Sequence, residues 1–283
     1  MAGSATQPGF DLHTHSVFSD GTTRPGTIAR EAAELGLAGF ALTDHDTVGG
    51  WDEAREGARA AGIELLPGIE ITTKHAGRSR HLLGYGIEPE SDELLAALAE
   101  VRESRLTRAR EMVRRLSAHY AITWEAVVGE EDARTVGRPH IADALVAGGY
   151  FADRSTVFAE TLHPASPYYL GTHAIETAEA IRLVRAAGGV AVLAHPVALR
   201  QRRPTSVAEL RQLAAAGLWG VELDHPENRV DWLPPLETAA AELGLAVTGS
   251  SDYHGAGKPN RLGERTTPVA VVERLRELVA VPS

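Results

Sequence analysis

The chain has 283 residues, of which 43% are hydrophobic, and its formal net charge is −10. This length and apolar content suffice for one large α/β domain, or for a domain with a sizeable insertion, and they exclude a mostly disordered chain. The absence of cysteine excludes disulfides, thiolate nucleophiles and cysteine-ligated zinc sites, and the acidic charge argues against broad capture of duplex nucleic acid.

The sequence also indicates where the protein resides. No apolar run approaches the roughly 20 residues that a membrane-spanning helix needs. Residues 1–9 contain neither the basic nor the apolar stretch that begins a secretory signal peptide, and the lack of cysteine fits a reducing compartment. We therefore expect a cytoplasmic protein without a membrane partner, and the sequence leaves its oligomeric state open.

Strands and helices are expected to alternate over residues 10–87. Short apolar runs lead into polar clusters, and the segments between them have helical periodicity. This alternation is typical of parallel βαβ units, whose functional side chains gather at the C-terminal ends of the strands. The expected strands are residues 10–12, 38–42, 63–71 and 81–87, and the expected helices are residues 25–35 and 51–61.

A long amphipathic helix is expected over residues 91–119, followed by short helical segments up to residue 169. Its arginines, which include Arg105 and Arg108, are expected to form a solvent-exposed face, with a binding role as the alternative. The alternation then resumes with helices at 174–187, 205–216, 232–243 and 269–279 and strands at 189–194, 218–223 and 245–249. We predict an α/β framework from residues 10–97 and 172–283, with residues 98–171 as a helical insertion that caps the substrate.

Side chains of the metal-ligand type recur just after the apolar strands. His13 and His15 point the same way in an extended segment, and the Ser19-Asp20-Gly21 turn can bring a carboxylate to them. The full set exceeds the roughly three protein ligands of a catalytic zinc, so we predict two or three divalent cations. Such a centre suits in-line displacement at phosphorus by a metal-bound hydroxide. The candidate ligands are His13, His15, Asp20, His45, Glu70, His81, His195, Asp252 and His254.

Structural roles for single members of this set stay open at this point. A lone histidine such as His45 is commonly a hydrogen-bonded structural residue, and Asp44 and Asp46 can be turn or N-cap residues of the next helix. The shared placement after strands favours the metal centre. Other polar residues can either line the pocket or lie in solvent, namely Glu222, Asp224, His225, Lys258 and Arg261.

These residues resemble the PHP (polymerase and histidinol phosphatase) family of metal-dependent phosphoesterases. The resemblance implies a distorted seven-stranded β/α barrel and manganese ions, although zinc and iron suit the same ligands. The motifs that carry it are Asp11–Ser16 with Ser19–Gly21, Leu42–Asp46, Pro67–Glu70, His81, His195-Pro196 and Ser251–Gly255. The implied ligand sets are His13, His15, Glu70 and Asp252 for one ion, Glu70 as a bridge with His81 and His195 for a second, and Asp20, His45 and His254 for a third.

The helical insertion resembles one branch of that family, the nucleoside 3′,5′-bisphosphate phosphatases with their relatives that trim short RNAs from the 5′ end. Arg138-Pro139-His140 begins a helix there, and proline at the first helical position leaves backbone N–H groups free to meet an anion. Arg138 and His140 are therefore candidates to bind a second, non-reacting phosphate. The alternative is that Arg138 lies on the surface and that His140 caps the helix or is buried.

The expected reaction is hydrolysis of a phosphate monoester, with a small phosphorylated nucleotide or a short RNA as substrate. A nucleoside 3′,5′-bisphosphate would lose its 3′-phosphate. The sequence does not identify the group that protonates the leaving oxygen, for which a metal-bound water and His225 are candidates. Two alternatives remain. One is another phosphatase of the family, such as a histidinol phosphatase, and the other is a non-catalytic metal-binding module like those attached to polymerases.

Overall fold

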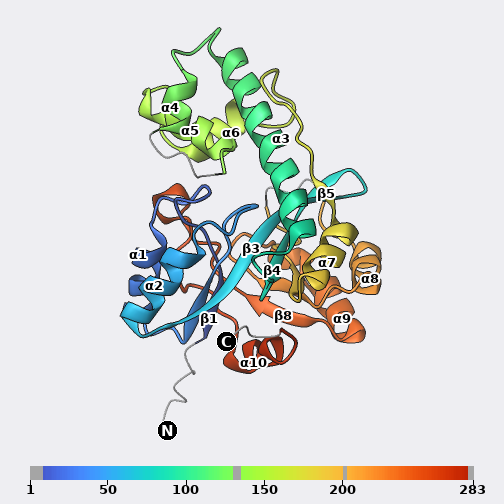
Figure 1. The fold of residues 1–283 in the computed structure, drawn as a ribbon. Coiled ribbons are helices and arrows are strands. Elements are labelled where there is room, and N and C mark those ends of the chain that lie inside the picture. The colour runs from blue at the N-terminus through green and yellow to red at the C-terminus, as the bar shows by residue number, and fades with distance from the viewer. Residues whose placement is uncertain (1–8, 130–134, 200–202, 280–283) are drawn as a thin grey trace.

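The structure, a computed structural model, describes residues 9–129, 135–199 and 203–279. Its centre is a curved sheet in the order β1-β2-β3-β4-β6-β7-β8, with β5 paired to β3 (Figure 1). A bridge between Thr14 and Tyr253 joins β1 to the segment after β8, so the seven main strands form a nearly closed barrel. The strands are β1 (Phe10–Thr14), β2 (Gly39–Leu42), β3 (Glu64–His75), β4 (Arg78–Tyr85), β5 (Ile175–Glu176), β6 (Val190–Leu193), β7 (Gly220–Asp224) and β8 (Ala246–Gly249).

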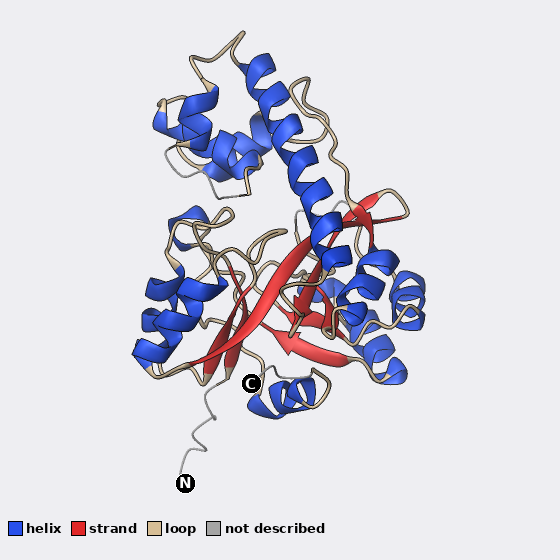
Figure 2. Ribbon diagram, in the orientation of Figure 1, coloured by secondary structure: helices blue, strands red, loops and turns tan. Residues whose placement is uncertain are grey.

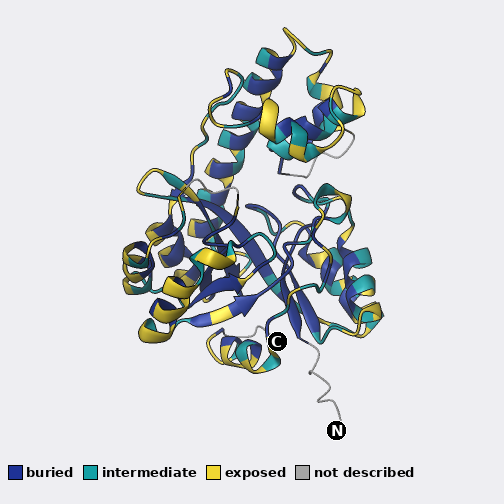
Figure 3. Ribbon diagram, turned by 180° about the vertical axis from the view of Figure 1, so that it is seen from behind, coloured by how far each residue is buried: buried dark blue, intermediate teal, exposed yellow. Residues whose placement is uncertain are grey.

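Helices cover the outside of the barrel (Figure 2), and two apolar clusters hold it together. Neighbouring strand residues face opposite sides, so Leu82 belongs to the cluster beneath the outer helices and Leu83 to the inner cluster. The strands are buried over most of their length (Figure 3), with exposed residues at Ser79 in β4 and Val247 in β8. The surrounding helices are α1 (Pro25–Glu34), α2 (Trp51–Ala61), α7 (Thr177–Ala186), α8 (Val207–Ala215), α9 (Pro234–Leu243) and α10 (Val269–Arg276).

The strand direction differs from the expectation at β4. β4 runs antiparallel to both β3 and β6, whereas β1-β2-β3 and β6-β7-β8 are parallel. Only Ala76 and Gly77 separate β3 from β4, and their φ angles of 48° and 74° are those of a tight hairpin turn. Because two residues cannot hold a crossover helix, a parallel arrangement of every strand was a wrong expectation here.

A second, helical body stands over one end of the barrel (Figure 1). Its elements are α3 (Asp92–Leu116), α4 (Trp124–Val128), α5 (Arg138–Ala147) and α6 (Arg154–Glu160). α3 belongs to both bodies, because Leu98 packs in the barrel cluster and Met112 in a separate cluster of the helical body. The predicted boundary at residue 98 therefore lies inside α3.

The arginines of α3 do not all face solvent as expected. Arg105 and Arg108 are buried, because the barrel lies against one part of the helix and the helical body against another. The helix expected from residue 174 instead begins at Thr177, after the short strand β5. Within the described residues, no helix combines the length and the apolar character that a bilayer crossing requires.

Candidate metal centre

All nine predicted ligands lie together at one end of the barrel. His13 lies in β1 with His15 just beyond it, and His195 follows β6. Glu70 and His81 are within the β3–β4 hairpin rather than after a strand, so the expected placement was wrong for these two. His81 pairs in register with Thr72, two residues from Glu70, which puts both side chains on one face of the hairpin.

Glu70 is the hub of the group. Its Oε2 lies 3.3 Å from His13 Nε2, 3.2 Å from His15 Nε2 and 3.0 Å from His45 Nδ1. Its Oε1 faces two further imidazole nitrogens, His81 Nδ1 at 2.7 Å and His195 Nε2 at 3.0 Å. Both oxygens of one buried carboxylate thus face several imidazoles, an arrangement suited to bridging metal ions.

Two aspartates extend the group on either side of His15. Asp20 Oδ1 lies 3.2 Å from His254 Nε2, and Asp252 Oδ1 lies 3.4 Å from His15 Nε2. Asp252 has a φ of 55°, in a region that favours glycine, so the loop holds a strained backbone at a ligand position. The ligand atoms form overlapping groups, which are His13, His15, Glu70 and Asp252, then His15, Asp20, His45 and His254, then His45, Glu70 and His81.

The hydrogen bonds on the far side of the rings determine which nitrogen faces the centre. His13 Nδ1 lies 3.0 Å from Glu222 Oε1, and His254 Nδ1 lies 2.8 Å from the backbone oxygen of Asp252. His15 Nδ1 lies 3.3 Å from Ser19 Oγ, whose own hydrogen goes to Asp44. A neutral ring that donates from Nδ1 keeps its lone pair on Nε2.

Those Nε2 atoms provide the test of whether metal ions fit. In His13, His15 and His254, Nε2 is buried and has no hydrogen-bond partner within the described part of the chain. Each of the three nonetheless lies near carboxylate oxygens of the group. Buried lone pairs without a donor, next to carboxylates, are satisfied by a cation, so the residues present fit divalent metal ions.

The ionisation of the group supports the same conclusion. Burial alone would raise the pKa of Glu70, but the imidazoles around it, His81 first, hold that pKa well below its usual range. Burial lowers the pKa of His254 to about 4, so its ring is neutral at neutral pH. Burial opposes charge on His15 as well, yet the neighbouring carboxylates of Asp252 and Glu70 raise its pKa to about 9. The carboxylates therefore attract positive charge to the site.

Three buried aspartates outside the ligand set fix the ligand loops. Asp11 accepts hydrogen bonds from Ser251 N and Ser251 Oγ, and burial raises its pKa to about 6. Asp44 accepts from Ser16 N at 2.8 Å and so holds the loop before Asp20. Neither Asp44 nor Asp46 caps α2, whose N-cap is Gly50, so the capping alternative was wrong. The sequence motifs contain these aspartates, but their hydrogen bonds to the ligand loops became evident only from the fold.

Glu222 is fully buried and stands behind His13. Its Oε1 faces His13 Nδ1 and accepts from Ser250 Oγ, and its Oε2 accepts from the backbone N–H of His195 at 2.8 Å. Both oxygens are therefore acceptors only. Glu222 fixes the ring of one candidate ligand and the backbone of another, in the manner of residues that orient metal-binding histidines.

The other residues left open by the sequence divide clearly. Lys258 Nζ donates to Asp252 Oδ2 at 2.6 Å and so belongs to the centre. His225 is buried, with Nε2 at 3.4 Å from Asp252 Oδ2 and Nδ1 accepting from the N–H of Glu227. Asp224 is exposed beside Arg265, and Arg261 is 84% exposed.

The helical body contacts a ligand loop of the centre through α6. Arg154 donates to the backbone oxygen of Asp20 at 3.1 Å, which ties α6 to the loop between β1 and α1. Arg138 donates to the backbone oxygen of Leu162 and lies 5.4 Å from the ring centre of Tyr169. His140 Nδ1 accepts from the N–H of Gly137 at the start of α5, which is the capping contact that the alternative reading described.

Comparisons with known proteins agree with this site. The PHP domain model matches residues 11–131. The chain is 33% identical over 258 residues to the 3′,5′-nucleoside bisphosphate phosphatase of Chromobacterium violaceum, with 89% of each chain covered. It is 34% identical over 252 residues to the 5′-3′ exoribonuclease Rnm of Salmonella typhimurium, which covers 87% of this chain and 85% of the relative.

A solved structure gives the same result. The crystal structure of a protein from Bifidobacterium adolescentis, assigned as a metal-dependent phosphoesterase, matches with a TM-score of 0.93 at 44% sequence identity. The match covers 95% of both chains. Likeness of this strength over nearly the whole of both chains, in sequence and in fold, shows that the protein belongs to the PHP domain family.

Proposed function

We propose that this metal-dependent phosphoesterase removes the 3′-phosphate from nucleoside 3′,5′-bisphosphates and leaves the 5′-nucleotide. The observation that carries the proposal is the convergence of buried, unpartnered imidazole lone pairs on Glu70. The chain is also related over most of its length to a phosphatase named for that substrate. A full set of ligand-type residues argues against a non-catalytic module of the same family.

We assign the residues that would hold the ions from the sets that the resemblance to the family implies. His13, His15, Glu70 and Asp252 form one group that matches the first proposed set. Glu70 would be shared with a second ion held by His81 and His195, and Asp20, His45 and His254 would hold a third. Manganese is the metal that we propose. Bound divalent ions would activate a water molecule and bind the phosphoryl oxygens.

Other residues of the chain hold the ligands in place and balance part of the negative charge of the site. Glu222 holds the His13 ring with Nε2 toward the centre, and Lys258 balances part of the charge of Asp252. Arg138 would bind the phosphate that is not hydrolysed, with His140 beside it. The side chain of His225 is buried between Glu222 and Asp252, which favours a supporting role over protonation of the leaving group.

Phosphate release from a substrate panel tests the proposal. Protein with measured metal content is supplied with adenosine 3′,5′-bisphosphate, adenosine 3′-monophosphate and histidinol phosphate. We expect release from the bisphosphate to exceed release from histidinol phosphate by at least tenfold in kcat/KM. Turnover of histidinol phosphate without turnover of the bisphosphate would replace the proposal with the first alternative. A full metal content with no hydrolysis of any phosphoester would support the non-catalytic module.

A second candidate activity is removal of nucleotides from the 5′ end of short RNA. The observation that favours it is the relationship to the exoribonuclease of Salmonella typhimurium over most of both chains. A 5′-phosphorylated oligoribonucleotide added to the panel tests it, because stepwise release of mononucleotides is resolved on a gel. An oligonucleotide that stays intact while the bisphosphate is hydrolysed would restrict the enzyme to small substrates.

A further inference from the structure

Three arginines gather where the helical body meets the barrel. Arg105 and Arg108 come from α3, and Arg138 begins α5. Arg105 has protein partners, because its Nε lies 2.8 Å from Asp46 Oδ2 and its guanidinium also donates to Thr72 Oγ1. Three guanidinium groups therefore share a region in which the Asp46 carboxylate pairs with one of them, Arg105, so the local charge is positive.

Arg108 differs from the other two. Arg108 is only 8% exposed, and its Nε is buried without a hydrogen-bond partner. Arg108 also forms no ion pair with any residue that the structure describes. Burial, followed by the like charges of Arg105 and Arg138, lowers the pKa of Arg108 to about 9. The group is still a cation at neutral pH. A buried cation without an anionic partner is costly, and an anion from outside the chain would remove that cost.

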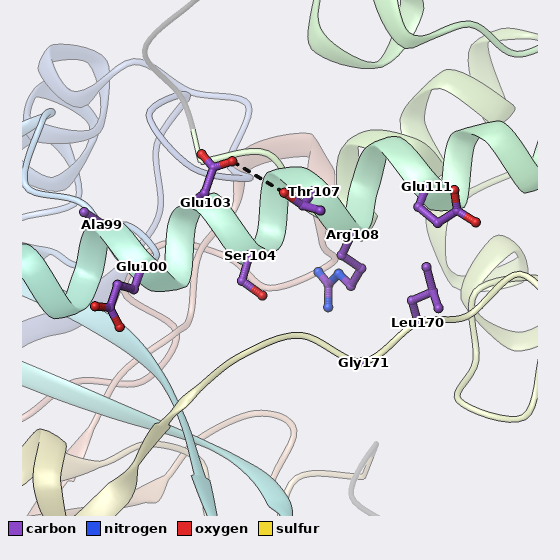
Figure 4. Close-up of a pocket in the computed structure, with 9 residues that line it drawn as sticks. All are labelled: Ala99, Glu100, Glu103, Ser104, Thr107, Arg108, Glu111, Leu170 and Gly171. Carbon is purple, nitrogen blue, oxygen red and sulfur yellow. Dashed lines mark hydrogen bonds between the residues drawn. The ribbon is translucent and has the colours of Figure 1, made fainter.

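The surroundings of Arg108 leave room for such an anion. A groove of about 750 Å³ runs between α3 and the segment at Leu170 and Gly171, and Arg108 points into it (Figure 4). Glu111, which also lines the groove, already pairs with Arg114 at 2.6 Å and with Arg115. The further acidic lining residues are Glu100 and Glu103, and Glu103 points away from the guanidinium in this view (Figure 4).

The position also relates Arg108 to the metal centre. Asp46, whose charge acts on Arg108, directly follows the candidate ligand His45 and accepts a hydrogen bond from the N–H of Thr72 at 2.6 Å. Thr72 lies two residues beyond Glu70 in β3. An anion bound to Arg108 would thus lie beside the loops that carry candidate metal ligands, but it would not occupy the metal positions themselves.

We propose that Arg108, together with Arg138, binds a phosphate of the substrate that is not hydrolysed, and that this contact selects bisphosphorylated nucleotides over monophosphorylated ones. The inference rests on the proposed function, since it names a residue that would recognise the second phosphate of that substrate. The ligand chemistry is a phosphate dianion, which suits the planar fork of a guanidinium.

Kinetics of Arg108→Gln test the selection. In the metal-loaded enzyme we expect kcat/KM for adenosine 3′,5′-bisphosphate to fall about ten- to a hundredfold, as for loss of one charged hydrogen-bond pair, and kcat/KM for adenosine 3′-monophosphate to change less than about twofold. Arg108→Lys keeps the charge without the fork, so its loss should be intermediate. Arg110→Gln, an exposed arginine two residues along the same helix, is the matched control and should change neither value.

Binding separates a failure of this inference from a failure of the proposed function. Adenosine 5′-monophosphate carries only the phosphate assigned to Arg108, so calorimetry should show at least tenfold weaker binding to Arg108→Gln than to the wild type. Equal binding by the two proteins, or an unchanged preference for the bisphosphate, overturns the inference even if the wild type is an active phosphatase. If the wild type binds the 5′-monophosphate through Arg108 but does not hydrolyse the bisphosphate, the result contradicts the proposed function and leaves the role of Arg108 intact.

The unfolding temperature provides a readout that does not depend on activity. Without nucleotide, Arg108→Gln should melt at the same temperature as the wild type or higher, because it removes a buried charge that has no partner. Adenosine 5′-monophosphate should then raise the melting temperature of the wild type more than that of the variant. A variant that melts well below the wild type would mean that Arg108 holds the fold together, which contradicts the assignment.

Discussion

At the scale of single residues, the centre depends on which imidazole nitrogen faces inward. His13, His15 and His254 each have Nδ1 next to a protein oxygen, so Nε2 is left for the centre. A free imidazole has no preference for which nitrogen faces the centre. The protein oxygen next to Nδ1 imposes that preference. The residues behind the ligands therefore control the site almost as much as the ligands do.

Glu222→Gln tests this control. Both oxygens of Glu222 accept from donors, which are His13, Ser250 and the backbone N–H of His195. An amide must place its own NH₂ against one of them, so His13 would lose its fixed orientation. We expect metal affinity to fall about tenfold to a hundredfold, measured by manganese titration of chelator-treated protein.

The matched control for that variant is Glu209→Gln. Glu209 is also a buried glutamate, but it pairs with Arg80 at 2.7 Å, away from the centre. The Glu209→Gln variant should lower the melting temperature without changing the metal affinity. Equal losses of metal affinity in the two variants would show that Glu222 acts through general stability and not through His13.

At the scale of elements, the β3–β4 hairpin separates what the sequence could predict from what it could not. The strand-end histidines were predictable, because a period of two and the repeated order of strand and polar cluster are local signals. The antiparallel direction of β4 depends on Ala76-Gly77, a turn whose significance is clear only when the flanking strands are known to extend to His75 and from Arg78. That turn is what brings His81 to Glu70.

Gly77→Ala should show how much the hairpin depends on this turn. Gly77 has a φ of 74°, where an added Cβ meets no other atom but the backbone conformation itself is unfavourable for alanine. We expect a loss of about 1 kcal/mol in the free energy of unfolding, measured by urea denaturation. Gly26→Ala is the control, since Gly26 is in the first turn of α1 and its nearest atom would lie 3.8 Å away.

The two glycine variants should therefore differ in their effect on the free energy of unfolding. Gly26→Ala reduces the freedom of the unfolded chain without strain, so it should leave stability unchanged or raise it by about 0.4–1 kcal/mol. If Gly77→Ala proved as stable as Gly26→Ala, the hairpin would tolerate another turn type and the positive φ would not define it.

At the scale of the whole molecule, buried charge joins parts that the sequence keeps apart. Arginine on an amphipathic helix indicates solvent exposure, and this holds for Arg110 but not for Arg105 or Arg108. Their burial arises only when α3 is placed between the barrel and the helical body. The sequence left the role of Lys258 open for the same reason, because its contact with Asp252 depends on how one loop folds.

The separate apolar clusters predict a local response to metal removal. The ligand loops meet at buried carboxylates and imidazoles, whereas Met112 and Leu145 pack in the cluster of the helical body without touching the centre. Chelation followed by hydrogen exchange should therefore reduce protection at residues 15–23 and 250–257, while amides around Leu145 keep theirs. Added manganese should restore the loops. Protection lost equally in both bodies would instead mean that the ions stabilise the whole chain as one cooperative unit, with α3 and the bond from Arg154 to the Asp20 carbonyl as connections between the bodies.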